Sequence, residues 1–350
     1  MKLTRKVKVG KITIGGGAPV SVQSMTNTPT ADERATLAQI TALEEAGCDL
    51  VRLAVTSEEE VDVCRRILSQ TSVPLVADIQ FDYKLAVACS EIGFPKVRFN
   101  PGNIGSEAGV RALVDACKAN GTVIRVGVNG GSLQKDLLIK YGRSAQALAE
   151  SAIMHAAILE KFGFYDTVLS VKSSDVRTCL EAYTLLHERC DYPLHLGVTE
   201  SGAKLAGVVK SSIGIGALLC RGIGDTIRVS LTGDPLAEVE AGLQILQALD
   251  LRKGPQIVAC PTCSRCGINL AALYDEVEAM LHSIKRPVKV AVMGCTVNGP
   301  GEAADADFGV AGGKNGKSVL FSKGKVLKTV ANERIIEELQ ALLNAYLQEA

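Results

Sequence analysis

From residue 20 to about residue 250, short runs of β-branched and other apolar residues alternate with longer stretches of helical periodicity. Each run predicts a strand, and glycines such as Gly47 and Gly163 stand where the helical stretches should stop. Strands that alternate with helices through short connections are parallel and joined by right-handed crossovers. Eight repeats in about 230 residues favour a (β/α)8 TIM-type barrel over an open doubly wound sheet. The predicted strands are Val20–Thr26, Leu50–Val55, Pro74–Ile79, Lys96–Asn100, Val123–Asn129, Thr167–Ser174, Pro193–Val198 and Thr226–Leu231.

The pattern changes after Arg252–Pro255, a segment with the composition of a linker. The helical and strand patterns beyond it predict a smaller α+β domain. We therefore expect an α/β barrel domain over residues 1–253 and a second domain over residues 254–350. In the second domain a Gly-rich segment follows the first predicted strand. Its predicted elements are a helix at Ile268–Ile284, a strand at Val288–Met293, a hairpin formed by Ser318–Ser322 and Lys325–Val330, and a closing helix at Asn332–Leu347.

Composition narrows the class of protein. Among 350 residues, 47% are hydrophobic and 22% charged, which is typical of a soluble chain with a large core. The 38 Lys and Arg balance 38 Asp and Glu, which argues against a nucleic-acid coat or a polybasic membrane anchor. Aromatic residues make up only 4% and Trp is absent, so a base-stacking platform is not expected. No run of about 18 apolar residues predicts a membrane span.

Cysteine usage points to a reducing compartment. Eleven cysteines are scattered along the chain, an odd number that does not indicate a secreted disulfide framework. The first ten residues are basic, but a Gly-rich stretch follows where a signal peptide needs an apolar run. We therefore expect a cytoplasmic protein whose thiols are free or bound to a metal.

Cationic side chains share one face of several predicted strands. The outer face of a barrel strand must be apolar to meet its helix, so these cations should point into the barrel. Buried cations need anions, which carboxylates such as Asp78 or Glu200 could supply within a core network. Five cations converging on one barrel instead favour a phosphorylated or diphosphate substrate at the carboxyl-terminal mouth. They are Arg52, Arg98, Arg125, Lys172 and Arg228.

Two glycine loops follow strands at this mouth, Asn100–Gly105 and Asn129–Ser132. Each could present backbone N–H groups to a phosphate, although an ordinary turn explains each loop as well. Three histidines, at 155, 187 and 282, fall in helical stretches and are expected to be structural or exposed. His195 falls on a predicted strand and is expected in the core.

The sharpest local motif is Cys260-Pro-Thr-Cys263-Ser-Arg-Cys266, with Cys295 some thirty residues later. A C-x2-C turn directs two thiolates at one metal, and the additional thiols favour a metal over a redox-active dithiol. Structural zinc and an iron–sulfur cluster both take about four ligands. The spacing nominates these four cysteines and does not choose between iron and zinc. The other seven are expected to be core or surface residues.

Several blocks of the chain resemble one family. They are Gln23–Thr28, Asp78–Tyr83, Arg98–Gly105, Leu196–Glu200, Gly224–Ser230, Cys260–Cys263 and Met293–Glu302, in this order. Together these blocks are similar to those of the bacterial (E)-4-hydroxy-3-methylbut-2-enyl diphosphate synthases of the non-mevalonate isoprenoid pathway, and the resemblance runs nearly end to end.

The resemblance implies a (β/α)8 barrel coupled to a C-terminal iron–sulfur domain, in a homodimer where one subunit's cluster closes over the other's barrel mouth. It implies the substrate 2-C-methyl-D-erythritol 2,4-cyclodiphosphate, whose ring is opened with loss of water by two electrons from flavodoxin or ferredoxin. It implies a [4Fe–4S] cluster held by Cys260, Cys263, Cys295 and Glu302. The positions matching diphosphate contacts are Arg52, Arg98, Arg125, Asn129, Lys172, Arg228 and Ser230, and those near the substrate hydroxyls are Thr199 and Glu200, with Glu200 a candidate acid.

An unusual ligand fits this chemistry, because a carboxylate holds cluster iron more weakly than a thiolate does. Glu302 is thus the ligand that could give way to the substrate. Two residues depart from the family pattern. Cys266 competes with Glu302 as fourth ligand, and Gln80 stands where many members carry His. Two other functions compatible with these patterns are a sugar-phosphate lyase or isomerase with structural zinc, and an electron carrier whose barrel only binds an anion.

Overall fold

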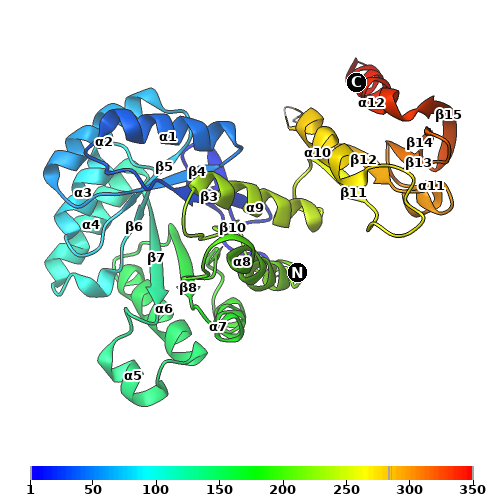
Figure 1. Cartoon of the computed structure of the whole chain (residues 1–350). Helices are drawn as coiled ribbons and strands as arrows, with labels where there is room; N and C mark the ends of the chain where they lie inside the picture. The colour runs from blue at the N-terminus through cyan, green and yellow to red at the C-terminus, as the bar shows by residue number, and fades with distance from the viewer. Residues whose placement is uncertain (1, 283, 285, 349–350) are drawn as a thin grey trace. The chain divides into compact units, whose positions relative to one another are not determined.

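The computed structural model describes residues 2–282, 284 and 286–348 (Figure 1). The chain divides into two compact units, one ending at Arg252 and the other beginning at Lys253. The expected domain limits at residues 1 and 350, and residue 283 within the predicted helix Ile268–Ile284, lie outside the described residues. Across the described part of the chain, no helix combines the length and apolar character that a membrane crossing needs.

The first unit is a barrel of parallel strands, as the alternating pattern predicts. Its strand order is β8-β7-β6-β5-β4-β3-β10-β9, and Leu169 of β8 bridges to Leu194 just before β9, which joins the two ends. The (β/α)8 prediction is confirmed. The strands are β3 (Ser21–Met25), β4 (Leu50–Ala54), β5 (Leu75–Asp78), β6 (Lys96–Arg98), β7 (Val123–Asn129), β8 (Thr167–Lys172), β9 (His195–Leu196) and β10 (Thr226–Ile227).

Several of these strands are shorter than predicted. Where Pro193–Val198 and Thr226–Leu231 are expected, only two residues of each form ladder pairs. The missing residues are mostly at the carboxyl ends, where the backbone leaves the ladder and carries polar side chains into the barrel mouth. Strand propensity does not predict where the backbone leaves the ladder, because the same apolar residues suit paired strands and unpaired extended backbone.

Helices surround the barrel, and the sequence marks most of their starts. Side chains of Asp32, Ser57 and Asp175 accept N–H hydrogen bonds at the first turn of α1, α2 and α7, which satisfies amides that have no helical partner. The helices are α1 (Glu33–Glu45), α2 (Glu58–Gln70), α3 (Tyr83–Glu91), α4 (Glu107–Asn120), α5 (Lys135–Tyr141), α6 (Ala145–Glu160), α7 (Val176–Arg189), α8 (Lys204–Leu219) and α9 (Pro235–Ala248), with a 3-10 turn, η1, at Pro101–Asn103.

A hairpin that the sequence analysis did not predict closes the amino-terminal end of the barrel. It consists of β1 (Val7–Val9) and β2 (Ile12–Ile14), which pair antiparallel. Their apolar side chains pack on the lowest inward residues of the barrel strands, among them Leu50 and Val123. The barrel interior is therefore sealed at this end, and its polar contents face the carboxyl-terminal mouth.

The second unit is built on a sheet ordered β11-β12-β13-β14-β15, with the first three strands parallel and the last two antiparallel. Helices α10 and α12 pack on one face around Val277, Val290 and Leu339, and α11 packs with the smaller cluster on the other. The elements are β11 (Pro255–Ala259), α10 (Leu270–Leu281), β12 (Val288–Met293), α11 (Gly299–Glu302), β13 (Phe308–Gly312), β14 (Lys317–Ser322), β15 (Lys325–Ala331), a 3-10 turn η2 (Asn332–Arg334) and α12 (Ile335–Gln348).

Two strands of this sheet correct the sequence analysis. The expected linker ends in β11, which begins at Pro255, and the Gly-rich segment contains β13. Gly309 is required there, because a Cβ atom would come within 2.7 Å of Ala291 and Phe321. Strands that place glycine against a neighbouring strand lack the apolar alternation used to predict them.

Candidate active site and metal centre

A polar cavity of about 180 Å³ opens where the barrel strands end. All five cations expected to point inward line it, and they come from five different strands or strand ends. The structure thus brings together side chains that lie up to 176 residues apart in the sequence. The lining residues are Arg52, Asp78, Gln80, Arg98, Arg125, Gly127, Val128, Asn129, Ser170, Lys172, Thr199, Arg228 and Ser230.

Part of this charge is neutralised inside the protein. Asp78 lies 3.4 Å from Arg98 and 3.8 Å from Arg52, measured between its carboxylate oxygens and the guanidinium nitrogens. Arg228 lies 3.2 Å from Glu238 of α9, a carboxylate that the sequence analysis did not single out. Burial alone would raise the pKa of Asp78, but the surrounding arginines outweigh it and hold that pKa below its ordinary value.

The remaining charge is unpaired. Within the described residues, Arg125 and Lys172 form no ion pair, so five cations face two carboxylates. Burial lowers the pKa of Lys172 well below its usual range, and the neighbouring Arg228 lowers it further. Burial likewise lowers the pKa of Arg52, to about 10, despite the opposing effect of Asp78. A free cavity of this kind is electrostatically unfavourable, and an anion would relieve it.

Two glycines make room for the cationic groups. A Cβ atom on Gly127 would lie 3.0 Å from nitrogens of both Arg98 and Arg125. A Cβ atom on Gly197 would lie 2.6 Å from Nζ of Lys172 and 2.7 Å from the backbone oxygen of Arg228. The sequence gives Gly127 only as a residue within a predicted strand and Gly197 only as part of a block that resembles the family. The structure shows that their lack of a side chain shapes the cavity.

Below the cavity lies a second layer of buried polar side chains. Lys96 and His195 are fully buried, Gln23 is almost so, and no hydrogen-bond partner for their polar atoms occurs among the described residues. Burial lowers the pKa of Lys96 well below its ordinary value, and Arg125 contributes to the shift. Lys96 begins the predicted strand Lys96–Asn100 and was not among the five expected cations. His195 lies in the core, as expected.

The two glycine loops use their amides internally. The backbone N–H of Gly102 donates to Nδ1 of His155 at 3.0 Å, and the N–H of Gly131 donates to Oδ1 of Asn129 at 3.1 Å. Burial lowers the pKa of His155 to about 4, which keeps its ring neutral and able to accept. These two amides are therefore engaged in holding the loops, which agrees with the ordinary-turn reading.

The loop after β9 carries Thr199 and Glu200. Thr199 lines the cavity, whereas Glu200 is exposed and is not among the lining residues. The backbone of Glu200 has a φ of 52°, a left-handed conformation that is uncommon for a residue with a side chain. A conformation of this kind costs free energy, so contacts around the loop must hold the backbone of Glu200 in it.

The cysteine motif lies at one edge of the second unit's sheet. Cys260 directly follows β11, and Cys295 follows β12 after Gly294. Because β11 and β12 are parallel and paired in register, these ends meet at the same edge. The amide of Gly267 also donates to the carbonyl of Gly294, which fastens the cysteine turn to the end of β12. Glu302 is exposed at the end of α11, and its Oε1 accepts from the Asn298 amide at 3.3 Å.

The environment of the thiols suits thiolate ligands. The N–H of Gly294 donates to Sγ of Cys260 at 3.1 Å. Hydrogen bonds from the backbone at Val297 and Asn298 lower the pKa of Cys295, and Arg265 adds to that effect. In the described part of the chain, no three His, Cys, Asp or Glu side chains converge as ligands of a single ion. A cluster distributes its ligands over several irons and does not need such convergence.

Cys266 is close to the same point. A Cβ atom on Gly294 would lie 2.8 Å from Sγ of Cys266 and 3.4 Å from Sγ of Cys260. The Cys266 thiol itself donates to the carbonyl of Ile268 at 3.2 Å, a bond that requires its proton. Cys263 is exposed at the tip of the turn. The structure therefore places all four sequence-nominated cysteines at this edge without choosing the fourth ligand.

Comparison with known proteins decides the family. Residues 4–243 match the GcpE TIM-barrel domain, and residues 256–345 match the GcpE protein C-terminal domain. The chain belongs to the GcpE family. A relative from Nitratidesulfovibrio vulgaris, named 4-hydroxy-3-methylbut-2-en-1-yl diphosphate synthase (flavodoxin), is 55% identical over 94% of this chain and 86% of its own. One of the same name from Ruminiclostridium cellulolyticum is 52% identical over 96% of each chain.

Solved structures resemble the barrel alone. Dihydropteroate synthase from Burkholderia cenocepacia, complexed with 7,8-dihydropteroate, covers 72% of this chain and all of its own with a TM-score of 0.52 and 14% identity. The Xanthomonas albilineans enzyme gives a TM-score of 0.51 at 16% identity, over 70% of this chain and 98% of its own. At such identities the likeness establishes the shared barrel fold and nothing about substrates.

Proposed function

We propose that this chain converts 2-C-methyl-D-erythritol 2,4-cyclodiphosphate to (E)-4-hydroxy-3-methylbut-2-enyl diphosphate. The relatives that carry the name of this synthase match it over nearly the whole chain. The observation that carries the proposal is the barrel cavity, where five cations face only two carboxylates. A cyclic diphosphate supplies the missing negative charge in a compact form. The barrel, residues 1–253, holds the substrate, and residues 254–350 form the redox domain.

The cavity residues orient the diphosphate. Arg125 and Lys172 bind its oxygens most strongly, because no carboxylate among the described residues pairs with them. Arg52, Arg98 and Arg228 keep one carboxylate partner each and complete the ring of donors. The neutral groups of Asn129 and Ser230 add hydrogen bonds. Substrate bound in this way leaves its carbon skeleton toward the open mouth.

The residues at the cysteine edge fit a [4Fe–4S] cluster. By the resemblance, Cys260, Cys263 and Cys295 would hold it together with Glu302, and the Cys266 thiol would keep its hydrogen bond to the carbonyl of Ile268. The N–H groups directed at the sulfurs of Cys260 and Cys295 stabilise thiolate ligands. When bound, such a cluster supplies single electrons and a Lewis-acidic iron at the position of its weakest ligand.

The reaction also needs a proton, because the ring opens on two-electron reduction and a hydroxyl group leaves as water. Glu200 supplies this proton, and Thr199 positions the hydroxyl. Glu200 stands beside the cavity in a strained conformation, so a small movement of its loop carries the carboxyl inward. The exposed position of Glu200 in the free protein keeps it in contact with solvent, from which it can be reprotonated.

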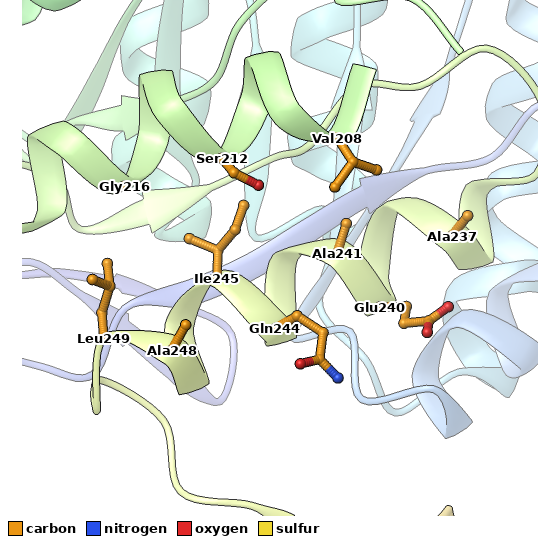
Figure 2. Close-up of a pocket in the computed structure, with 10 residues that line it drawn as sticks. All are labelled: Val208, Ser212, Gly216, Ala237, Glu240, Ala241, Gln244, Ile245, Ala248 and Leu249. Atoms are coloured by element: carbon orange, nitrogen blue, oxygen red, sulfur yellow. The ribbon is translucent and has the colours of Figure 1, made fainter. Parts of the chain in front are cut away.

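The proposed partners are flavodoxin or ferredoxin as donor and a second copy of the chain. An apolar groove of about 560 Å³ runs between α8 and α9 on the outside of the barrel, where Val208 and Ser212 face Ala241 and Ile245 (Figure 2). Beside it, Leu205, Val209 and Ile213 form a stripe on α8 and are 76%, 46% and 54% exposed. The second copy covers this face, since monomers seldom expose such a surface.

Leu205→Asp/Ile213→Asp should give monomers in analytical ultracentrifugation, and a persisting dimer would refute this assignment.

A cytoplasmic location is part of the proposal. All eleven cysteines are free thiols, and five of them are buried. Burial raises the pKa of several, including that of Cys64 to about 12, so these thiols stay protonated and unreactive. A protein with so many unpaired thiols is suited to a reducing compartment.

Metal analysis tests the proposed function against the alternative of a barrel with structural zinc. Protein purified anaerobically should contain about four irons and four sulfides per chain. Adding the cyclic diphosphate to the reduced protein should change its electron paramagnetic resonance spectrum, and the dehydrated diphosphate should form under a chemical reductant. One zinc per chain without sulfide would refute the proposal. An electron paramagnetic resonance spectrum that does not change when the substrate is added would favour a simple electron carrier.

A further inference from the structure

The edge of the second unit's sheet that carries the cysteines also carries unpaired positive charge. The turn between β13 and β14 includes Lys314 and Lys317, both exposed. Because β13 is parallel to β12, this turn lies at the same edge as Cys260 and Cys295. The cysteine turn itself carries Arg265, also exposed. A cationic surface thus adjoins the thiols, defined here as Arg265, Lys314 and Lys317.

The two turns are in direct contact. A Cβ atom on Gly267 would lie 2.3 Å from the backbone oxygen of Gly313, the residue before Lys314. Ile268 packs against Gly312, as a Cβ atom on that glycine would lie 3.0 Å from its side chain. The lysine turn therefore lies beside the cysteine turn along the sheet edge, where Cys263 stays exposed and Cys260 and Cys295 are half-buried.

The opposite edge of the same sheet is built differently. There Lys289 pairs with Asp305, and Lys323 lies 3.0 Å from Asp307. Lys314 and Lys317 form no ion pair with any described residue. This includes Glu333 of η2, which does not pair with either lysine. At the opposite edge two lysines are thus neutralised, although Lys325 there forms no ion pair with a described residue, whereas both lysines beside the cysteine turn are left available.

An exposed apolar side chain completes the surface. Val297, two residues after Cys295, is 71% exposed. Transient redox complexes use small interfaces in which charges at the rim steer the partners and a few apolar contacts lie near the redox centres. An acidic protein surface would be attracted to this rim.

We propose that Arg265, Lys314, Lys317 and Val297 form the docking surface for the acidic face of a flavodoxin-type electron donor. The proposal rests on the proposed function, because it needs a redox centre at the cysteine edge. The lysines raise the rate of encounter and hold the donor beside the cysteine turn, so that electrons enter from the flank. The small substrate takes no part in this contact.

Charge reversal at matched positions tests the proposal. Lys317 begins β14 at the cysteine edge, and Lys325 begins β15 at the opposite edge, both exposed. In reconstituted holoenzyme, Lys317→Glu should raise the flavodoxin concentration for half-maximal rate about fivefold at low salt, and Lys314→Glu/Lys317→Glu about twentyfold. Lys325→Glu should change it less than twofold. Binding of oxidised flavodoxin, followed by fluorescence anisotropy, should weaken in the same order and lose its salt dependence.

A chemical reductant separates this proposal from the proposed function. With dithionite and methyl viologen replacing flavodoxin, the double variant should turn over within about twofold of the wild type and keep its substrate KM. If Lys325→Glu weakens the flavodoxin response as much as Lys317→Glu does, the docking surface is wrong. A raised substrate KM with the chemical reductant would instead make the lysines substrate contacts. Absence of turnover in the wild type with any reductant would refute the proposed function itself.

Discussion

The barrel mouth and the cysteine edge bind different things because they are built differently. The mouth is assembled from buried, rigid strands, and its cations are held in place by Asp78, Glu238 and two glycines. The cysteine edge is an exposed turn whose ligands are near one another without converging. The mouth is therefore prepared for its ligand in advance, at an electrostatic cost. The edge acquires its final geometry from the group it binds.

The largest expected effect comes from removing a cluster ligand at the cysteine edge, a change that leaves the barrel mouth intact. Cys295→Ser should abolish the iron–sulfur absorption and all synthase activity, because one strong ligand is lost. Cys266→Ser, the matched control in the same region, should retain cluster and activity. Iron and sulfide content measure both. Loss of the cluster in Cys266→Ser with retention in Cys295→Ser would overturn the assignment of Glu302.

The next largest effect comes from a change at the barrel mouth that should alter diphosphate binding and protein stability in opposite directions. Lys172→Met removes a buried cation that lacks a carboxylate partner, so it should weaken binding of the cyclic diphosphate by about 100-fold, or roughly 3 kcal/mol. The same change should raise the melting temperature of the free protein, since it relieves repulsion from Arg228 and Arg125. Calorimetric titration and thermal unfolding measure the two quantities. A variant that loses both affinity and stability would show that Lys172 is a structural residue.

A smaller effect is expected where Gly197 leaves space for the Lys172 ammonium group. Gly197→Ala should displace the Lys172 ammonium group and weaken diphosphate binding by about tenfold, with a loss of about 1–3 kcal/mol in stability. Gly130→Ala, also in a loop after a barrel strand, meets no atom within 4 Å and should leave both unchanged. Equal effects of the two changes would contradict the proposed role of Gly197.

The smallest effect is on pH dependence. The pKa of Lys172 is depressed in the free cavity by burial and by neighbouring cations, and a bound diphosphate should raise it again. Binding then takes up a proton, so affinity should fall as pH rises above neutrality. Titrations in buffers of different ionisation enthalpy measure the uptake. A pH-independent affinity in this range would contradict the unpaired state of Lys172.

The sequence predicts the barrel well because its strands repeat and its cations fall on one phase of each strand. It also nominates Cys260 and Cys295 together through motif spacing, and the strand ends that carry them meet at one edge of the sheet. It does not pair Arg228 with Glu238, because that contact joins a strand end to a helix face ten residues later and follows from the barrel's closure. Nor does it reveal why Gly102 must be glycine, since the reason is the ring of His155 on a distant helix.

Some strands were missed for other reasons. β1 and β2 alternate apolar and polar residues, but each has only three residues. The hairpin formed by β1 and β2 lies in a basic segment, and only its packing on Leu50 and Val123 shows that it seals the barrel. The sequence does not predict β13, because it contains glycines that its neighbouring strands require and so lacks a strand-like pattern. Local pattern thus predicts elements whose periodicity extends over several residues, whereas very short strands and strands shaped by a neighbour are recognised only in the folded chain.

The central claim is that the barrel mouth alone recognises the diphosphate and that the cysteine edge serves only the redox step. Calorimetric titration of the cyclic diphosphate into Cys295→Ser, which should carry no cluster, tests it most directly. The account predicts binding within about tenfold of the holoenzyme's affinity, with proton uptake, and no turnover. Binding that disappears with the cluster would show that the cations of the mouth do not form the substrate site by themselves, and would contradict the account.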